Sequence, residues 1–217
     1  MRLLVLFLVF TITVFASNIT HFSYDGAINP ASSAFVKKSI LEANKQNSQL
    51  IIFELNTPGG LLSSTRDIVS QILNSKIPIV VYISPKGSRA ASAGTFILYA
   101  SHIAAMTKGT NVGAATPVQI AFNKLKKDNT PSTMQTKAIN DASAYIESLA
   151  KLRNRNIQWA KKSVVKGESI DSEKALKLGV IDFIADDLDS LLEKLNGVTV
   201  LVDGEMVQID TKNSSIK

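Results

Sequence analysis

Cysteine is absent from this 217-residue sequence, and histidine occurs only twice, as His21 and His102. The absence of cysteine excludes a disulfide framework, a thiolate nucleophile and a cysteine-ligated zinc site. Two isolated histidines also argue against a histidine-rich metal centre, and we expect no cofactor. Few side chains therefore remain that could serve as a catalytic base.

Charged residues are scarce as well, at 19% of the chain, whereas hydrophobic residues account for 45%. This balance indicates one ordered globular domain rather than a disordered chain. The net charge is +6, and much of the excess lies between residues 151 and 166. We interpret this basic segment as a solvated helical face, with attraction to an anionic membrane surface as the alternative.

Long hydrophobic runs are missing except at the N-terminus. Arg2 precedes an apolar run over residues 3–15, which ends at Ala16. This pattern is typical of a signal peptide, and an uncleaved N-terminal anchor is the alternative, although a membrane span needs about 20 residues. Either way, residues 1–16 predict an extracytoplasmic protein, secreted or membrane-anchored, and nucleic acid is not expected as a partner.

The body of the chain alternates between two kinds of segment. Apolar runs rich in branched residues predict buried strands, at 50–55, 77–83, 102–106 and 180–184. Helical spacing lies between them, at 30–47, 61–74, 92–100, 134–152 and 171–178. This alternation predicts an α/β fold with a mostly parallel sheet of right-handed βαβ units and flanking helices.

Other segments depart from this alternation. Residues 198–209, with Asp203-Gly204 at the turn, predict a C-terminal β-hairpin. We therefore expect a single domain over 18–210 and a disordered tail over 211–217. The polar stretch 119–132 predicts a functional flap, because loops of this length in compact domains are often functional.

Two loops follow predicted strands and are rich in small residues. Gly59 and Gly60 permit positive φ and close backbone approach, so their N–H groups could face a developing negative charge. One unit later, Ser92 lies in the run AASAG at 90–94. The N–H of Ala93 could complete an oxyanion hole, since both loops leave the carboxyl ends of parallel strands. An ordinary turn and a helix N-cap are the alternative interpretations.

A serine nucleophile needs a base. His102 opens a predicted buried strand, where we expect a packed, hydrogen-bonded histidine, and His21 lies near the chain start. Lysine can act instead, provided that desolvation lowers its pKa from about 10.4 toward neutrality. Lys137 is the favoured base, because the segment 131–140 contains no carboxylate that would stabilise the ammonium. A surface lysine on a helix is the alternative.

Four segments occur in an order that resembles a known family: LNTPGG (55–60), AASAGT (90–95), SHIAAM (101–106) and GTNVGA (109–114). From about residue 18 to 196, the chain is similar to the N-terminal protease domain of the NfeD membrane proteins, relatives of ClpP and signal peptide peptidase A. The resemblance implies a ClpP/crotonase-like fold and a serine–lysine dyad. It places the family serine on Ser92, the lysine on Lys137, and the oxyanion-hole region on Gly59, Gly60 and Ala93.

The resemblance also implies partners. Family members dimerise and cleave hydrophobic segments of stomatin-like membrane proteins, so we expect such a substrate and a homodimer or higher homo-oligomer. Longer members continue into membrane helices, which makes this chain a short member or a fragment. Arg89 departs from the small-residue character of the nucleophile loop, and we expect it to point to solvent rather than bind a substrate carboxylate.

Two other functions remain as alternatives to a serine endopeptidase. A crotonase-type acyl-thioester enzyme would use the same fold, but the export signal argues against an intracellular substrate. A non-catalytic scaffold could bind the hydrophobic tail of a membrane protein, and Ser92 would then be only an N-cap.

Overall fold

The computed structural model describes residues 17–117, 133–212 and 214–217. The predicted signal or anchor at 1–16 and the predicted flap at 119–132 lie outside the described residues. In the part of the chain that the structure describes, no helix combines the length and apolar character needed to cross a membrane.

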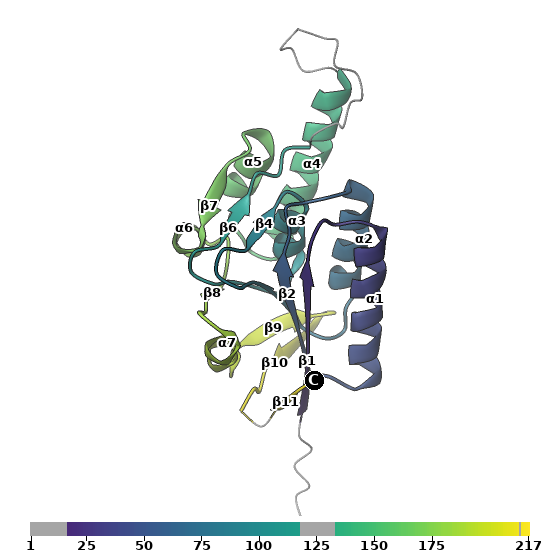
Figure 1. The fold of residues 1–217 in the computed structure, drawn as a ribbon, viewed down its shortest axis with the longest axis vertical. Helices are drawn as coiled ribbons and strands as arrows, with labels where there is room; N and C mark the ends of the chain where they lie inside the picture. The colour runs from purple at the N-terminus through teal and green to yellow at the C-terminus, as the bar shows by residue number, and fades with distance from the viewer. Residues whose placement is uncertain (1–16, 118–132, 213) are drawn as a thin grey trace, which may run out of the picture.

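A six-stranded sheet forms the centre of the fold (Figure 1), and each neighbouring pair of its strands is parallel. Runs of branched apolar residues suit strands that are covered on both faces. In spatial order the strands are β11 (Ser214–Ile216), β1 (Ser17–Asp25), β2 (Leu50–Asn56), β3 (Ile79–Ile83), β5 (Ile103–Met106) and β8 (Phe183–Ile184).

Alternate residues of the strands feed two separate cores. Ile51 and Phe53 belong to the larger core, whereas Leu50 and Ile52 belong to the smaller core on the opposite face. The larger core is covered by α1 (Pro30–Lys45), α2 (Leu62–Leu73) and α3 (Ala93–Ala100). The smaller core is covered by α7 (Leu188–Leu195) and the hairpin of β9 (Thr199–Val202) and β10 (Glu205–Gln208).

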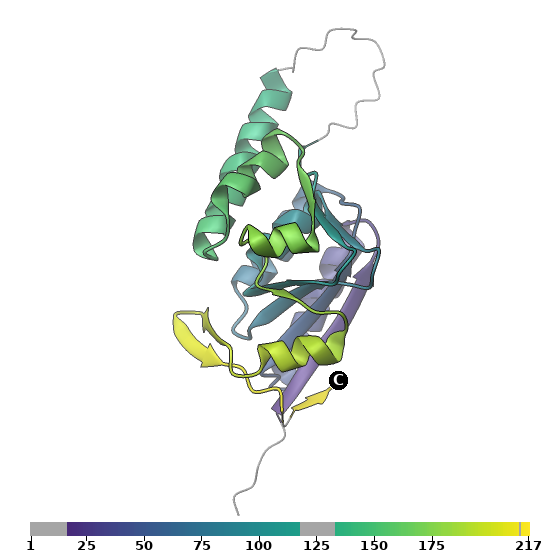
Figure 2. The same cartoon turned by 90° about the vertical axis from the view of Figure 1, so that its left-hand side faces the viewer.

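A second, three-stranded sheet carries the loop that contains Ser92. Its strands are β4 (Arg89–Ala91), β6 (Asn111–Gly113) and β7 (Ser169–Asp171), with β6 in the middle. Beside it lie α4 (Thr133–Leu152), α5 (Ile157–Val165) and α6 (Ser172–Lys177). Figure 2 shows α4 and α5 side by side, at the end of the molecule opposite the β9–β10 hairpin.

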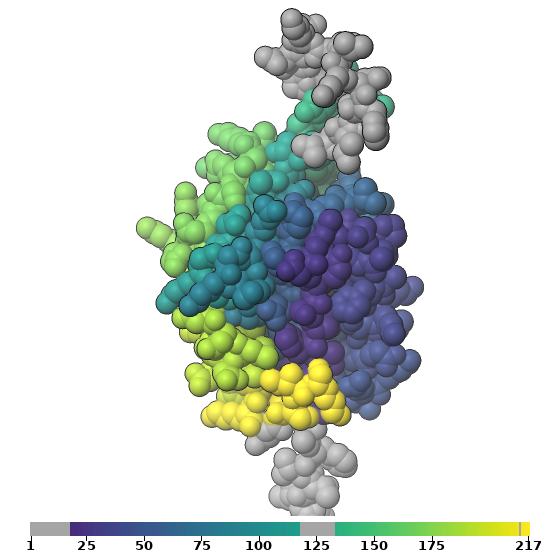
Figure 3. Space-filling model, viewed as in Figure 1, coloured from purple at the N-terminus to yellow at the C-terminus, as the bar shows by residue number. Residues whose placement is uncertain are grey.

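These elements confirm the predicted α/β architecture, the parallel sheet, the flanking helices and the C-terminal hairpin. The small sheet and α5 were not predicted because their elements are short, and α7 was missed although its leucines follow helical spacing. The tail differs from the expected disorder: residues of β11 pair with β1, with Ile216 opposite Ile19, and cover its lower end in Figure 3. The unpaired edge of β1 supplies the backbone partners that order this segment.

Candidate active site

Ser92 joins β4 to α3 with a backbone that non-glycine residues rarely adopt. Its φ is 50° and its ψ is −107°, in a strained region that costs about 1–3 kcal/mol. Ser92 occupies the N-cap position of α3, but its side chain makes no capping hydrogen bond to the helix. A serine held on a sharp strand-to-helix turn presents its hydroxyl outward, as in the nucleophile elbow of α/β-hydrolases.

Hydrogen bonds on both sides hold Ser92 in this conformation. The Ser92 amide donates to the Gly113 carbonyl at 2.9 Å. The Thr95 hydroxyl lies within 3.0 Å of the carbonyl oxygens of both Ala90 and Gly113, so it ties the first turn of α3 to β4 and β6. These buried bonds offset the strain at Ser92.

The glycine turn after β2 lies directly against Ser92. The Thr57 amide donates to the Arg89 carbonyl at 2.8 Å, and the Ala91 amide donates back to the Thr57 carbonyl at 3.1 Å. A Cβ added to Gly59 would lie 2.7 Å from the Ser92 Cβ and 3.2 Å from its Oγ. The prediction that the two loops meet in space is therefore confirmed, and only glycine fits at position 59.

The backbone amides around Ser92 differ in their bonding. The Gly59 amide donates to the Thr57 hydroxyl at 3.1 Å. No acceptor for the amides of Gly60 and Ala93 is found within residues 17–117, 133–212 and 214–217. Ala93 is the first residue of α3, where the helix itself offers its N–H no partner. Among the described residues, the amides of Gly60 and Ala93 thus have no acceptor; Ala93 follows Ser92 directly, and Gly60 follows the glycine that packs against Ser92.

Lys137 lies on the first turns of α4, and contacts between helices define where α4 runs. The Phe96 and Tyr145 rings stack with centroids 5.9 Å apart, and further along Arg153 Nε donates to the Ala100 carbonyl at 2.8 Å. Helices α3 and α4 therefore run in the same direction. Since Ser92 precedes Phe96 by one turn and Lys137 precedes Tyr145 by about two, Lys137 lies about one turn beyond the level of Ser92.

The Lys137 side chain is exposed, and no hydrogen bond joins it to Ser92 among the described residues. Arg89 is also exposed, as predicted, and its amide donates to the Asn56 side-chain oxygen at 3.0 Å. The described residues hold no group of three or more acidic, histidine or cysteine side chains that could ligate a metal.

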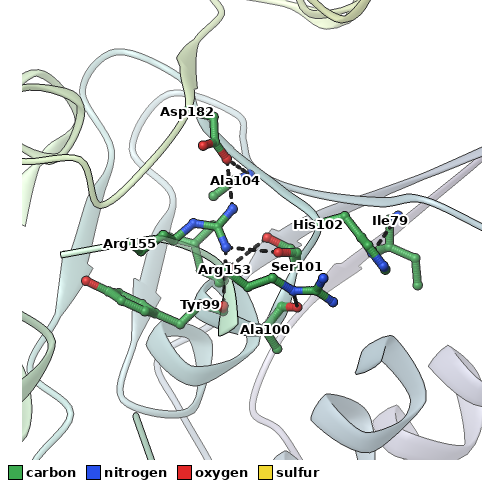
Figure 4. A network of polar contacts seen from close by, with 10 residues as sticks. Ile79, Tyr99, Ala100, Ser101, His102, Ala104, Arg153, Arg155 and Asp182 are labelled. Atoms are coloured by element: carbon green, nitrogen blue, oxygen red, sulfur yellow. Dashed lines mark hydrogen bonds and ion pairs between the residues drawn. The ribbon is translucent and has the colours of Figure 1, made fainter. Parts of the chain in front are cut away.

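His102 lies at the opposite end of α3 from Ser92, inside a polar network (Figure 4). The Ile79 amide donates to His102 Nδ1 at 3.1 Å. Burial, and secondarily the nearby Arg153 and Arg155, lower the pKa of His102 to about 3. The prediction of a packed, hydrogen-bonded histidine is confirmed. The other histidine, His21, pairs with Glu54 at 3.0 Å.

The centre of this network is Arg155, which sequence reasoning missed. Its guanidinium donates to the carbonyls of Tyr99 and Ser101, at 3.2 and 2.9 Å, and to Asp182 at 2.7 Å. Asp182 also accepts from the Ala104 amide at 2.7 Å. The carboxylate inside the apolar run 180–184 was the signal that could have found this pair, although the Asp182 side chain is 40% accessible and only Arg155 is buried.

Residues 22–203 match the family model for the NfeD1b N-terminal domain. The chain belongs to the NfeD1b family. It is 38% identical over 177 residues to the membrane-bound protease PH1510 of Pyrococcus horikoshii, an alignment that covers 81% of this chain and 39% of that protein. This NfeD1b chain thus spans about two fifths of the length of the curated relative.

Solved structures resemble the NfeD1b domain over most of its length. One is the 1510-N membrane-bound stomatin-specific protease in a serine-to-alanine mutant, with a TM-score of 0.87, 33% identity and coverage of 94% of this chain and 98% of that one. Another is a lysine-to-alanine mutant in complex with a substrate peptide, with a TM-score of 0.85, 34% identity and coverage of 93% and 91%. The predicted family and its ClpP/crotonase-like fold are therefore confirmed.

Proposed function

We propose that this NfeD1b domain is a serine endopeptidase with Ser92 as nucleophile and Lys137 as base. The observation that carries the proposal is the strained Ser92 backbone, at φ 50° and ψ −107°, with a hydroxyl that does not cap its helix. Strain of this kind persists only where the surroundings enforce it, and it clusters at active sites. The serine and lysine mutants of 1510-N, one with a substrate peptide, add support for these two residue types.

The proposed chemistry assigns a role to each predicted residue. Ser92 Oγ attacks the scissile carbonyl while Lys137 accepts its proton and then passes it to the leaving amine. The amides of Gly60 and Ala93 donate to the oxyanion, because within the described residues neither amide has an acceptor. Gly59 contributes by its missing side chain, which leaves room for the Ser92 hydroxyl. Water then attacks the acyl group while Lys137 accepts its proton, and Lys137 returns the proton to Ser92 Oγ as the product acid leaves.

The proposed substrate is a hydrophobic segment of a stomatin-like membrane protein. PH1510 is named a membrane-bound protease, and the structures of 1510-N are described as stomatin-specific. In this chain, apolar side chains are exposed beside the proposed dyad: Leu61 at 49% and Met134 at 70%. We also propose an extracytoplasmic, membrane-bound location. We further propose a homodimer or higher homo-oligomer, whose size sedimentation of the purified protein would measure.

Labelling by a fluorophosphonate and cleavage of an apolar peptide test the dyad together. We expect Ser92→Ala to abolish both signals, and Lys137→Ala to reduce both by at least about a hundredfold, in line with the loss of a general base. Matched controls on α4 are Ser148→Ala and Lys151→Ala, which change the same residue types at exposed positions.

Each outcome of this test points to one interpretation. If wild-type protein binds the peptide but neither cleaves nor labels, the domain is a scaffold for hydrophobic tails. If activity survives in Lys137→Ala but not in Ser92→Ala, the serine is correct and the base is another residue. Loss of labelling in the two control variants would mean that α4 had been damaged.

A further inference from the structure

An acidic residue follows the proposed base by one helical turn. Asp141 lies four residues after Lys137 on α4. Side chains at this spacing are neighbours on the helix surface, with Cβ atoms about 5–6 Å apart. The carboxylate-free segment 131–140 thus ends immediately before an acid that can reach Lys137. A free carboxylate here would stabilise the ammonium form of the lysine, which cannot accept a proton from Ser92.

The Asp141 carboxylate is already engaged by a residue from another helix. Arg66, in the first part of α2, donates from Nη2 to Asp141 Oδ2 at 2.7 Å. The Arg66 guanidinium also lies 4.1 Å from the centroid of the Tyr145 ring, one turn further along α4. Tyr145 in turn stacks on Phe96, which lies one turn after Ser92. Both contacts of Arg66 therefore join α2 to α4, and the Tyr145–Phe96 stack extends this link to α3.

The other charged groups on the surrounding helices are few. Helix α3 contains no charged residue. From α5, Lys161 pairs with Glu147, which lies ten residues after Lys137 on α4 and also pairs with Lys151. On α2, Asp67 is exposed and forms no ion pair within the described ranges. Asp141 is thus the acid closest to Lys137 along α4, and Arg66 is its ionic partner.

We propose that Arg66 is a positioning residue that holds the Asp141 carboxylate away from Lys137, so that the lysine amine stays available as the base. The inference rests on the proposed function, because it concerns the protonation of the proposed dyad. The pair itself is exposed, with side chains 39% and 63% accessible, so its contribution to stability is small. The proposed role of the Arg66–Asp141 pair is electrostatic: Arg66 neutralises the negative charge that Asp141 would otherwise present to Lys137.

The test compares the pH dependence of fluorophosphonate labelling in four variants between pH 6 and 10. In Arg66→Met, Asp141 loses its partner, and we expect the midpoint of the pH–rate curve to move about 0.2–0.4 pH unit upward, as for an exposed i,i+4 ion pair. The rate at neutral pH then falls about 1.5- to 2.5-fold, while the high-pH plateau remains. Arg66→Lys retains a cation and is expected to keep the wild-type midpoint.

The decisive variant is the double substitution Arg66→Met with Asp141→Asn. It removes both the guanidinium and the carboxylate, so we expect the midpoint to return to the wild-type value, as in Asp141→Asn alone. A merely structural role for Arg66 would instead lower the rate at every pH without moving the midpoint, and the double variant would not recover. That result would overturn the inference.

The failure of the proposed function gives a different result. If wild-type protein shows no labelling that depends on Ser92, no pH–rate curve exists in any variant, and the dyad itself is refuted. If labelling depends on Ser92 and all four curves share one midpoint, the nucleophile stands and the role of Arg66 is refuted. Circular dichroism of each variant verifies that it is folded.

Discussion

The two ends of helix α3 are built in opposite ways. At the C-terminal end, the carbonyls of Tyr99, Ala100 and Ser101 accept hydrogen bonds from buried or half-buried arginines, as Figure 4 shows. At the N-terminal end, the amide of Ala93 has no acceptor among the described residues, and Ser92 does not cap the helix. Cations suit the negative end of a helix, whereas open amides at the positive end suit an incoming anion.

The C-terminal end of α3 thus anchors the helix, whereas the N-terminal end carries the proposed active site. The C-terminal end is fixed by charge-assisted bonds, and its histidine is kept neutral by burial. The N-terminal end is held by close backbone packing around glycines and contains the strained backbone of Ser92. At the N-terminal end the Ala93 amide has no acceptor among the described residues, which the proposed oxyanion site requires. The following substitutions test each half of this comparison.

Arg155→Met is expected to have the largest effect on stability. The side chain of Arg155 is almost fully buried, and its loss leaves the carbonyls of Tyr99 and Ser101 without their donor. We expect the free energy of unfolding to fall by about 3 kcal/mol, measured by urea denaturation. The control is Arg66→Met, an exposed arginine whose ion pair contributes about 0–1 kcal/mol. Equal losses in both variants would contradict the comparison.

Gly94→Ala tests the close packing at the N-terminal end. The new Cβ would lie 2.7 Å from the Thr57 Cγ2 and 3.2 Å from the Ala90 Cβ. We expect a loss of about 2 kcal/mol in the free energy of unfolding, together with weaker labelling of Ser92. Thr57→Ser removes Cγ2 and retains the hydroxyl, so it should recover most of the loss in the double variant. If the double variant did not regain stability, the Thr57 Cγ2 would not be the atom with which the new Cβ clashes.

His102→Asn tests the neutral histidine at the anchored end. Because the folded pKa of about 3 lies below the unfolded value of about 6.5, the unfolded chain takes up a proton first as pH falls. The free energy of unfolding should therefore decline by an extra 1.4 kcal/mol or so for each pH unit below 6 in wild type. Asparagine keeps an acceptor near Nδ1 but does not titrate. If the free energies of unfolding of wild type and His102→Asn changed in parallel from pH 6 to 4.5, the prediction would be refuted.

Ser92→Gly should have the smallest effect on the free energy of unfolding. Unlike the other substitutions, it should be stabilising, relative to Ser92→Ala. Glycine adopts the observed φ without strain, although it loses more chain entropy on folding than other residues. We expect Ser92→Gly to be about 1 kcal/mol more stable than Ser92→Ala in thermal or urea unfolding, while both lack labelling. If alanine were the more stable variant, the backbone at position 92 would not be strained.

The two ends of α3 were also unequally predictable. The runs around Gly59 and Ser92 showed that two loops should meet, because parallel strands end at one edge of a sheet. Nothing local indicated that Arg155 would bind carbonyls more than 50 residues away, since a basic run between 151 and 166 is typical of a solvated face. Charge alone does not distinguish an exposed cation from a buried one.

Amino-acid sequence by itself determined the α/β architecture, the family and the two small-residue loops, since periodicity, turn chemistry and motif order are local properties. Only the tertiary structure decided which amides lack an acceptor among the described residues, that the Ser92 backbone is strained, and that Asp141 is bound by Arg66. It also ordered residues 214–216 as a strand. These features depend on contacts between segments far apart in the chain, and no local pattern specifies where such segments meet.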